Sequence, residues 1–137
     1  SQSMQIVCIQ SYSLRCAYPA YLAIVITALF HLGFWIVEMF LWTTPKIAAN
    51  FNLTIDQAKL MAPLAANMGL YNGLLAIGLL WAWFVKQSDI SISLLFLIGI
   101  MIAGVYGAIT VKRSILWVQA LPATIALGSI ILQNQIP

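Results

Sequence analysis

Four long apolar stretches constrain the fold of this chain more than any other feature of its sequence. They cover about residues 18–42, 62–84, 90–111 and 115–132. Each is about long enough to cross the hydrocarbon core of a bilayer, which takes roughly 20 helical residues. Their apolar residues follow one another without the strict alternation that marks the strands of a membrane barrel. We therefore predict an all-α fold, an integral membrane four-helix bundle with antiparallel, up-down topology.

The composition supports lipid as the solvent for most of the chain. Of the 137 residues, 63% are hydrophobic and only 7% are charged, whereas a soluble domain carries roughly 25% charged residues. The length allows a single transmembrane domain, residues 18–137, after an N-terminal extension, residues 1–17, whose start resembles a tag remnant. The net charge of +3 comes from scattered basic residues. This argues against a nucleic-acid partner and leaves membrane lipids as the expected one.

The connections between the stretches predict how the helices are joined. Two of them, residues 86–89 and 112–114, are short, so neighbouring helices should run antiparallel. In the longer first connection, Thr54 and Gln57 have the spacing of a capping box, which predicts that a helix starts directly after Thr54. Pro63 then predicts a kink before the apolar stretch proper.

Basic residues indicate the orientation in the membrane. The first and third connections share one side, and the positive-inside rule places that side in the cytoplasm and both termini outside. This side holds four of the six basic residues, Lys46, Lys59, Lys112 and Arg113, against Arg15 and Lys86 on the other side. Lys112 and Arg113 are interpreted as topology anchors, with an anionic lipid headgroup as the alternative partner. We expect a multi-pass protein of the bacterial inner (plasma) membrane.

The sequence carries no motif for a metal or a cofactor, and we expect neither. Its two cysteines, Cys8 and Cys16, lack the spacing of a metal site. They are interpreted as ordinary thiols, or as a disulfide if the N-terminus faces an oxidising compartment. A single histidine and a single glutamate would under-ligate a metal ion.

Polar side chains inside the predicted spans need a physical reason, because an acid at the centre of a spanning helix costs roughly 2.5–3.5 kcal/mol. His31 and Glu38 lie seven residues apart on the first span, which is about 10.5 Å along one helix face. Trp35 lies between them. The other spans contribute further polar residues, namely Asn67, Tyr71, Asn72, Tyr106 and Gln119.

Antiparallel packing should bring these groups toward one leaflet, beside the first and third connections, because every span contributes a polar group near that side. We predict a pocket there, in which Glu38 and His31 form a catalytic acid/base pair. The predicted ligand-binding residues are Asn67, Tyr71, Asn72, Tyr106, Gln119 and Trp35. The alternative is that these groups only hold the helices together by hydrogen bonds. Four glycines are expected to permit close helix approach, namely Gly69, Gly73, Gly104 and Gly107.

Several segments resemble one membrane-protein family closely. They are residues 38–45 (EMFLWTTP), 65–73 (AANMGLYNG), 103–108 (AGVYGA), and 118–119 (VQ) with 122–123 (PA). In this order they are similar to the small bacterial and fungal membrane family catalogued as domain of unknown function 1304, over roughly His31 to Leu127. One departure is Met68, where the family typically carries glutamine, and the residues before Tyr18 are also atypical. The resemblance implies a four-helix membrane fold and no particular activity.

Three functions from different classes agree with these residues, and the sequence leaves open whether the protein is an enzyme. The first is a pocket that binds, or transforms by isomerisation or hydration, a small lipophilic molecule through Glu38 and His31. The second is a small four-helix transporter that acts as a homo-oligomer, a dimer, with Glu38 as coupling acid. Polar groups clustered toward one leaflet argue against a midplane transport site. The third is a structural or assembly subunit of a membrane complex.

Overall fold

The computed structural model describes residues 2–85 and 90–135, with side chains for residues 19–85 and 90–134, and every regular element in these ranges is helical. Two of the elements are short π turns, of which the first directly follows an α-helix and the second runs directly into one. In chain order the elements are α1 (Gln2–Ile36), η1 (Val37–Leu41), α2 (Pro45–Asn50), α3 (Ile55–Val85), α4 (Ile90–Thr110), η2 (Leu116–Ala120) and α5 (Leu121–Gln135). The predicted all-α fold is confirmed.

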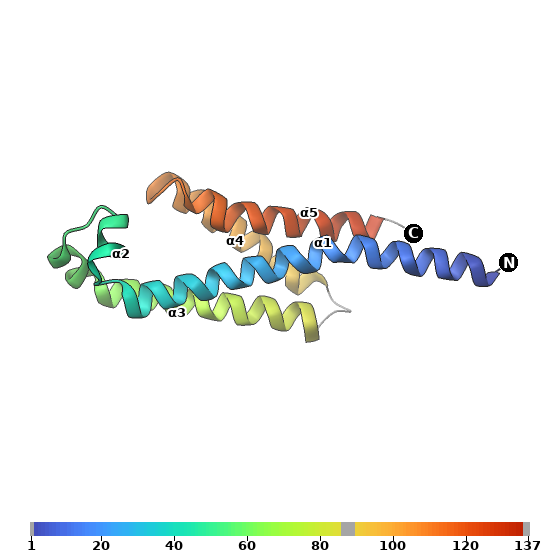
Figure 1. Cartoon of the computed structure of the whole chain (residues 1–137), viewed down its shortest axis with the longest axis horizontal. Helices are drawn as coiled ribbons and strands as arrows, with labels where there is room; N and C mark the ends of the chain where they lie inside the picture. The colour runs from blue at the N-terminus through green and yellow to red at the C-terminus, as the bar shows by residue number, and fades with distance from the viewer. Residues whose placement is uncertain (1, 86–89, 136–137) are drawn as a thin grey trace.

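In the described part of the chain, four helical segments are long and apolar enough to cross a membrane, as predicted. They are Pro19–Leu41, Ile55–Val85, Ile90–Thr110 and Leu116–Asn134. The end of α1 and η1 together form the first span, and η2 and α5 form the fourth. Consecutive spans run antiparallel along the length of the molecule (Figure 1). The chain is therefore a multi-pass membrane protein built as a helical bundle.

The helix α3 begins before the second apolar stretch because a capping box starts it. The Thr54 N–H donates to Gln57 Oε1 at 2.9 Å, and the Gln57 N–H donates to the Thr54 hydroxyl at 3.2 Å. These reciprocal bonds satisfy two donors near the start of the helix that would otherwise be unpaired, and they confirm the predicted start. The helix then runs unbroken past Pro63 to Val85.

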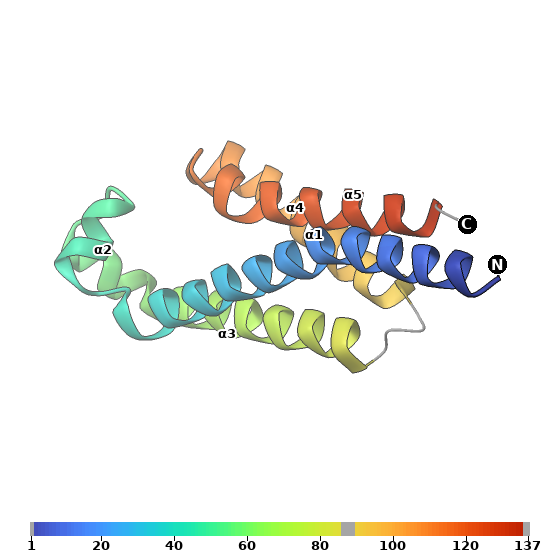
Figure 2. The same cartoon turned by 45° about the vertical axis from the view of Figure 1, so that its right-hand side comes forward.

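The four spans pack as a ring. α1 packs against α3 on one flank and against α5 on the other, while α4 packs against α3, η2 and α5. Away from the core, toward α2, the α1–α3 pair and the α4–α5 pair diverge (Figure 1, Figure 2). Apolar side chains from all four spans form the core nearer the chain termini, and its most buried members include Ile24, Leu79, Leu97, Ile100 and Ile130.

A contact between the first and third connections joins the α1–α3 pair to the α4–α5 pair at the α2 end of the bundle. The short helix α2, which the sequence did not predict, begins with Pro45, a residue suited to a first helical turn. The Lys112 ammonium donates to the Asn50 carbonyl oxygen at 2.7 Å and to its side-chain Oδ1 at 2.6 Å. It also lies 5.8 Å from the centroid of the Phe51 ring, whose centroid is 5.0 Å from that of Trp42. The first and third connections thus share one end of the bundle, as the antiparallel arrangement predicts.

Two sequence predictions fall outside the described part of the structure. They are the pairing of Cys8 with Cys16, whose side chains are not described, and the conformation of the short connection 86–89. The backbone of residues 2–17 is helical and continues into the first span as part of α1. The division of the chain at residue 17 stays a prediction.

Candidate functional site

A carboxyl group and an amide meet between the first two spans. Glu38 lies in η1, the π turn at the end of the first span, and Asn72 lies in the middle of α3. The Asn72 side-chain amide donates to Glu38 Oε2 at 2.7 Å, and the contact is partly buried. Single π turns interrupt the regular hydrogen-bond ladder of an α-helix and are frequent at functional sites. The bond therefore joins an irregular segment of one span to a regular segment of the next.

Glycines on α3 let η1 and the end of α1 approach closely enough for this bond. A Cβ added at Gly69 would lie 3.1 Å from Glu38 Cβ and 3.1 Å from the Trp35 carbonyl oxygen. A Cβ at Gly73 would lie 2.9 Å from the Trp35 indole. The same indole donates its N–H to Met39 Sδ at 3.2 Å. Close packing thus holds both Glu38 and Trp35 against α3.

His31 is fully buried two turns before Glu38. Its Nδ1 lies 2.8 Å from the Thr27 carbonyl oxygen, and because a carbonyl oxygen only accepts, Nδ1 carries the proton. The other ring nitrogen, Nε2, is buried and has no hydrogen-bond partner among the described residues. In a neutral imidazole Nε2 is an acceptor. The bundle therefore contains an acceptor to which no described protein group donates.

The other predicted site residues form no described hydrogen bond to the Glu38–Asn72 pair. Asn67 and Tyr71 are exposed on α3, and Tyr106 is 69% exposed on α4. Gln119 is partly buried in η2, whereas η1 packs against α1 and α3. The residues near the Glu38–Asn72 pair are thus Trp35 and, two turns away, His31. The structure does not gather one polar group from every span around the pair.

The chemistry available at the Glu38–Asn72 pair is hydrogen bonding and proton transfer. An ionised carboxylate has about four lone-pair sites, and Asn72 occupies one of them. The remaining sites can accept from a hydroxyl or an amine. Among the side chains of residues 19–85 and 90–134, no three of His, Cys, Asp or Glu lie close enough together to hold a metal ion.

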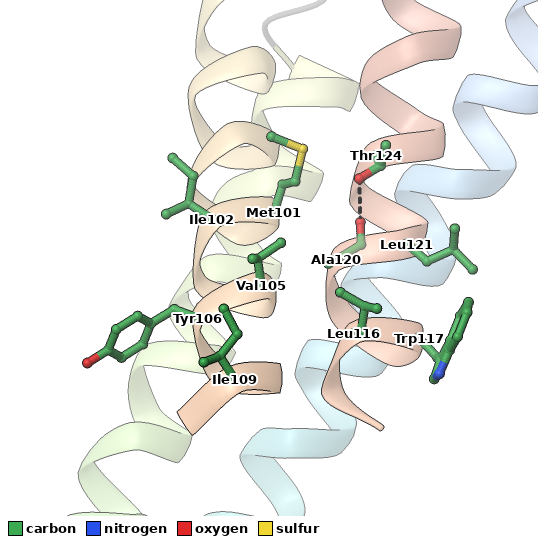
Figure 3. Close-up of a pocket in the computed structure, with 10 residues that line it drawn as sticks. All are labelled: Met101, Ile102, Val105, Tyr106, Ile109, Leu116, Trp117, Ala120, Leu121 and Thr124. Atoms are coloured by element: carbon green, nitrogen blue, oxygen red, sulfur yellow. Dashed lines mark hydrogen bonds between the residues drawn. The ribbon is translucent and has the colours of Figure 1, made fainter. Parts of the chain in front are cut away.

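An open apolar groove lies elsewhere, between α4 and the fourth span (Figure 3). Its volume is about 540 Å³. α4 and η2 touch beneath it, since a Cβ at Gly104 would come within 2.6 Å of the Ala120 nitrogen. Tyr106, predicted for the pocket around Glu38, lines this groove instead, on the side opposite Trp117. The full lining is Met101, Ile102, Val105, Tyr106, Ile109, Leu116, Trp117, Ala120, Leu121 and Thr124.

Sequence reasoning missed the groove because it depends on how two helices pack. Gly104 did signal a close helix approach, and its contact with Ala120 confirms that prediction. Which side chains then face the groove depends on how α4 and η2 are rotated about their axes. A rotation of one residue turns a helix by about 100°, so the lining cannot be assigned before the packing is known.

Four membrane-spanning helices and an intramembrane carboxyl–amide pair define a small multi-pass membrane protein. The chain belongs to the family described as protein of unknown function (DUF1304), whose model matches residues 25–131. It is also similar to the "Uncharacterized protein YpaA" of Lactococcus lactis subsp. lactis (strain IL1403), with 30% identity over 113 residues, 79% of this chain and 95% of that protein. No solved structure matches the chain. The resemblance stated from the sequence motifs is thereby confirmed.

Proposed function

We propose that this protein binds, within the membrane, a small lipophilic molecule that carries a hydroxyl or amine group. The observation that carries the proposal is the hydrogen bond of 2.7 Å between Asn72 and Glu38, inside two spanning segments. Glu38 is the polar anchor of the ligand, and Asn72 orients its carboxyl group. Trp35, held against α3 beside this pair, supplies an apolar wall.

The balance of energies argues that Glu38 does more than join helices. A charged side chain costs roughly 2.5–3.5 kcal/mol at the centre of a span on insertion scales, and the cost is smaller for Glu38, which lies in the last turn of the first span. A hydrogen bond between spanning helices contributes on average about 0.6 kcal/mol. A glutamine at this position could accept the same bond from Asn72 without a charge. Helix association therefore does not by itself require an acid at this position, and a ligand that needs a carboxyl group accounts for one.

His31 suggests the kind of group that such a ligand carries. Its Nε2 is a buried acceptor without a described protein donor, and the carboxylate of Glu38 is also an acceptor. Both groups therefore favour a ligand that donates. Since they lie about 10.5 Å apart along the helix, a ligand that touches both would bridge them, and proton transfer for isomerisation or hydration is the chemistry they would support.

The test compares small molecules that copurify with the wild-type chain and with Glu38→Gln. Both proteins are purified from the same membranes into nanodiscs, and extracted organic molecules are identified by mass spectrometry against empty nanodiscs. Asp56→Asn is the matched control, because it also turns an acid into an amide, but at an exposed position in the first turn of α3. We expect Glu38→Gln to fold normally and to lose a species that wild type and Asp56→Asn retain.

The alternatives give different results in the same comparison. If wild type carries no species beyond the empty nanodisc, or if Glu38→Gln retains the same species, Glu38 is not a ligand anchor and the proposal fails. Loss of folding in Glu38→Gln would favour the structural subunit. Proton-coupled uptake of a compound into vesicles by wild type, abolished in Glu38→Gln, would favour the transporter.

A further inference from the structure

The groove between α4 and the fourth span has the depth of one leaflet. Its lining on α4 extends from Met101 to Ile109, which is about 12 Å along the helix axis. On the facing wall it extends from Leu116 to Thr124, again about 12 Å. Half of a hydrocarbon core of about 30 Å is about 15 Å. The groove thus runs from the third connection toward the middle of the bilayer, along the direction of a lipid chain.

Positive charge gathers at the end of the bundle that holds the first and third connections. The first and third connections, with the start of α3, carry one described carboxylate, Asp56, against four cations, Lys46, Lys59, Lys112 and Arg113. Lys112 is engaged with Asn50 through two hydrogen bonds. The exposed Arg113 guanidinium has no hydrogen-bond or ion-pair partner among the described residues, so it is the cation nearest in sequence to the groove that is available to a ligand.

We propose that this groove binds one anionic phospholipid, with an acyl chain between α4 and the fourth span and the phosphate at Arg113. The guanidinium suits a phosphate because it presents several donors in one plane. Tyr106 and Trp117, on opposite sides of the groove (Figure 3), are amphipathic aromatics of the kind found at the level of lipid headgroups. The volume of about 540 Å³ lies within the range of about 300–1,000 Å³ typical of ligand sites.

An anionic phospholipid fits better than a second copy of this chain. A second copy would bring its own cations to the same end of the bundle, whereas a lipid phosphate neutralises them. A basic residue near the membrane surface favours anionic lipid by a factor of about five. The site is separate from the Glu38–Asn72 pair, which lies between α1 and α3, so neither proposal depends on the other.

The experiment measures lipid adducts on the purified full chain by native mass spectrometry. The probes are 1-palmitoyl-2-oleoyl phosphatidylglycerol and the phosphatidylcholine with identical chains, each added at the same ratio. Arg113→Gln removes the charge, and its matched control is Lys59→Gln, an exposed cation on α3, which contributes no residue to the groove lining. Val105→Trp fills the groove from a wall position that is 43% exposed, and its control is Leu95→Trp, 72% exposed and outside the lining.

We expect wild type to retain phosphatidylglycerol over phosphatidylcholine, and Arg113→Gln to lower phosphatidylglycerol binding by about fivefold. Val105→Trp should lose both lipids, and both controls should match wild type. Equal binding of the two lipids to wild type, or unchanged binding in Arg113→Gln and Val105→Trp, would overturn the proposal. A dimer that becomes a monomer in Val105→Trp, with lipid binding unchanged, would instead identify the groove as an interface between two copies.

Discussion

The contact between Gly104 and η2 predicts that one added methyl group will force two spans apart. A Cβ at Gly104 would lie 2.6 Å from the Ala120 nitrogen, 2.9 Å from its Cβ and 3.0 Å from its Cα. Two of these three atoms belong to the backbone, so no side-chain rotation can relieve the clash. The helices must instead shift, and overpacking of this kind costs about 1–3 kcal/mol.

A second glycine on α4 provides the matched control for this substitution. A Cβ at Gly99 would meet nothing within 4 Å, so Gly99→Ala changes the helix propensity without a clash. Alanine is more favourable than glycine in a helix interior by about 0.8–1.0 kcal/mol. Gly104→Ala gains the same propensity and suffers the overpacking. The difference in unfolding free energy between the two variants should therefore be about 1–3 kcal/mol, with Gly104→Ala the less stable.

The assay is unfolding of both variants by sodium dodecyl sulfate in mixed micelles, followed by circular dichroism and by tryptophan fluorescence. The free energy of unfolding of each variant is compared with that of wild type under identical detergent conditions. Equal stability of Gly104→Ala and Gly99→Ala would refute the reasoning, because it would mean that α4 and η2 do not touch at Ala120.

Three further substitutions test the other contacts. Thr54→Ala should lower the free energy of unfolding by about 0.5–2 kcal/mol through loss of the helix cap, measured in the same detergent assay. Asn72→Leu should cost about 1–3 kcal/mol because the partly buried Glu38 carboxyl loses its donor, and a variant as stable as wild type would contradict this. Lys112→Met, which breaks the exposed contacts with Asn50, should cost under about 1 kcal/mol while increasing hydrogen exchange in α2.

The features that could be predicted from sequence depend on residues that are close together in the chain. Each span is a continuous apolar run whose backbone must satisfy its own hydrogen bonds in lipid, and helices do this within the segment. The capping box needs only Thr54 and Gln57, three residues apart. The short helix α2 escaped prediction because its six residues are too few to show a helical period.

The candidate site could be predicted only in part. The sequence selected both Glu38 and Asn72, because polar groups inside apolar spans stand out. It could not distinguish Asn72 from Asn67 as the partner of Glu38, since these two residues point in different directions from α3. It also grouped Tyr106 with Glu38, whereas this side chain lies at the edge of the groove between α4 and the fourth span.

By itself, the sequence determined that the chain crosses the membrane as antiparallel helices. It also identified the side chains in the spans that are too polar to face lipid without a structural or functional reason. Hydrophobic transfer and backbone hydrogen bonding act on each segment separately. The local composition of a segment is therefore enough to predict both its place in the membrane and its helical structure. Only the tertiary structure decided that Glu38 meets Asn72, and that a groove opens between α4 and the fourth span. Those outcomes depend on the rotation of each helix about its axis and on the π turns at Glu38 and Gln119. Packing between residues that are distant in the chain determines both.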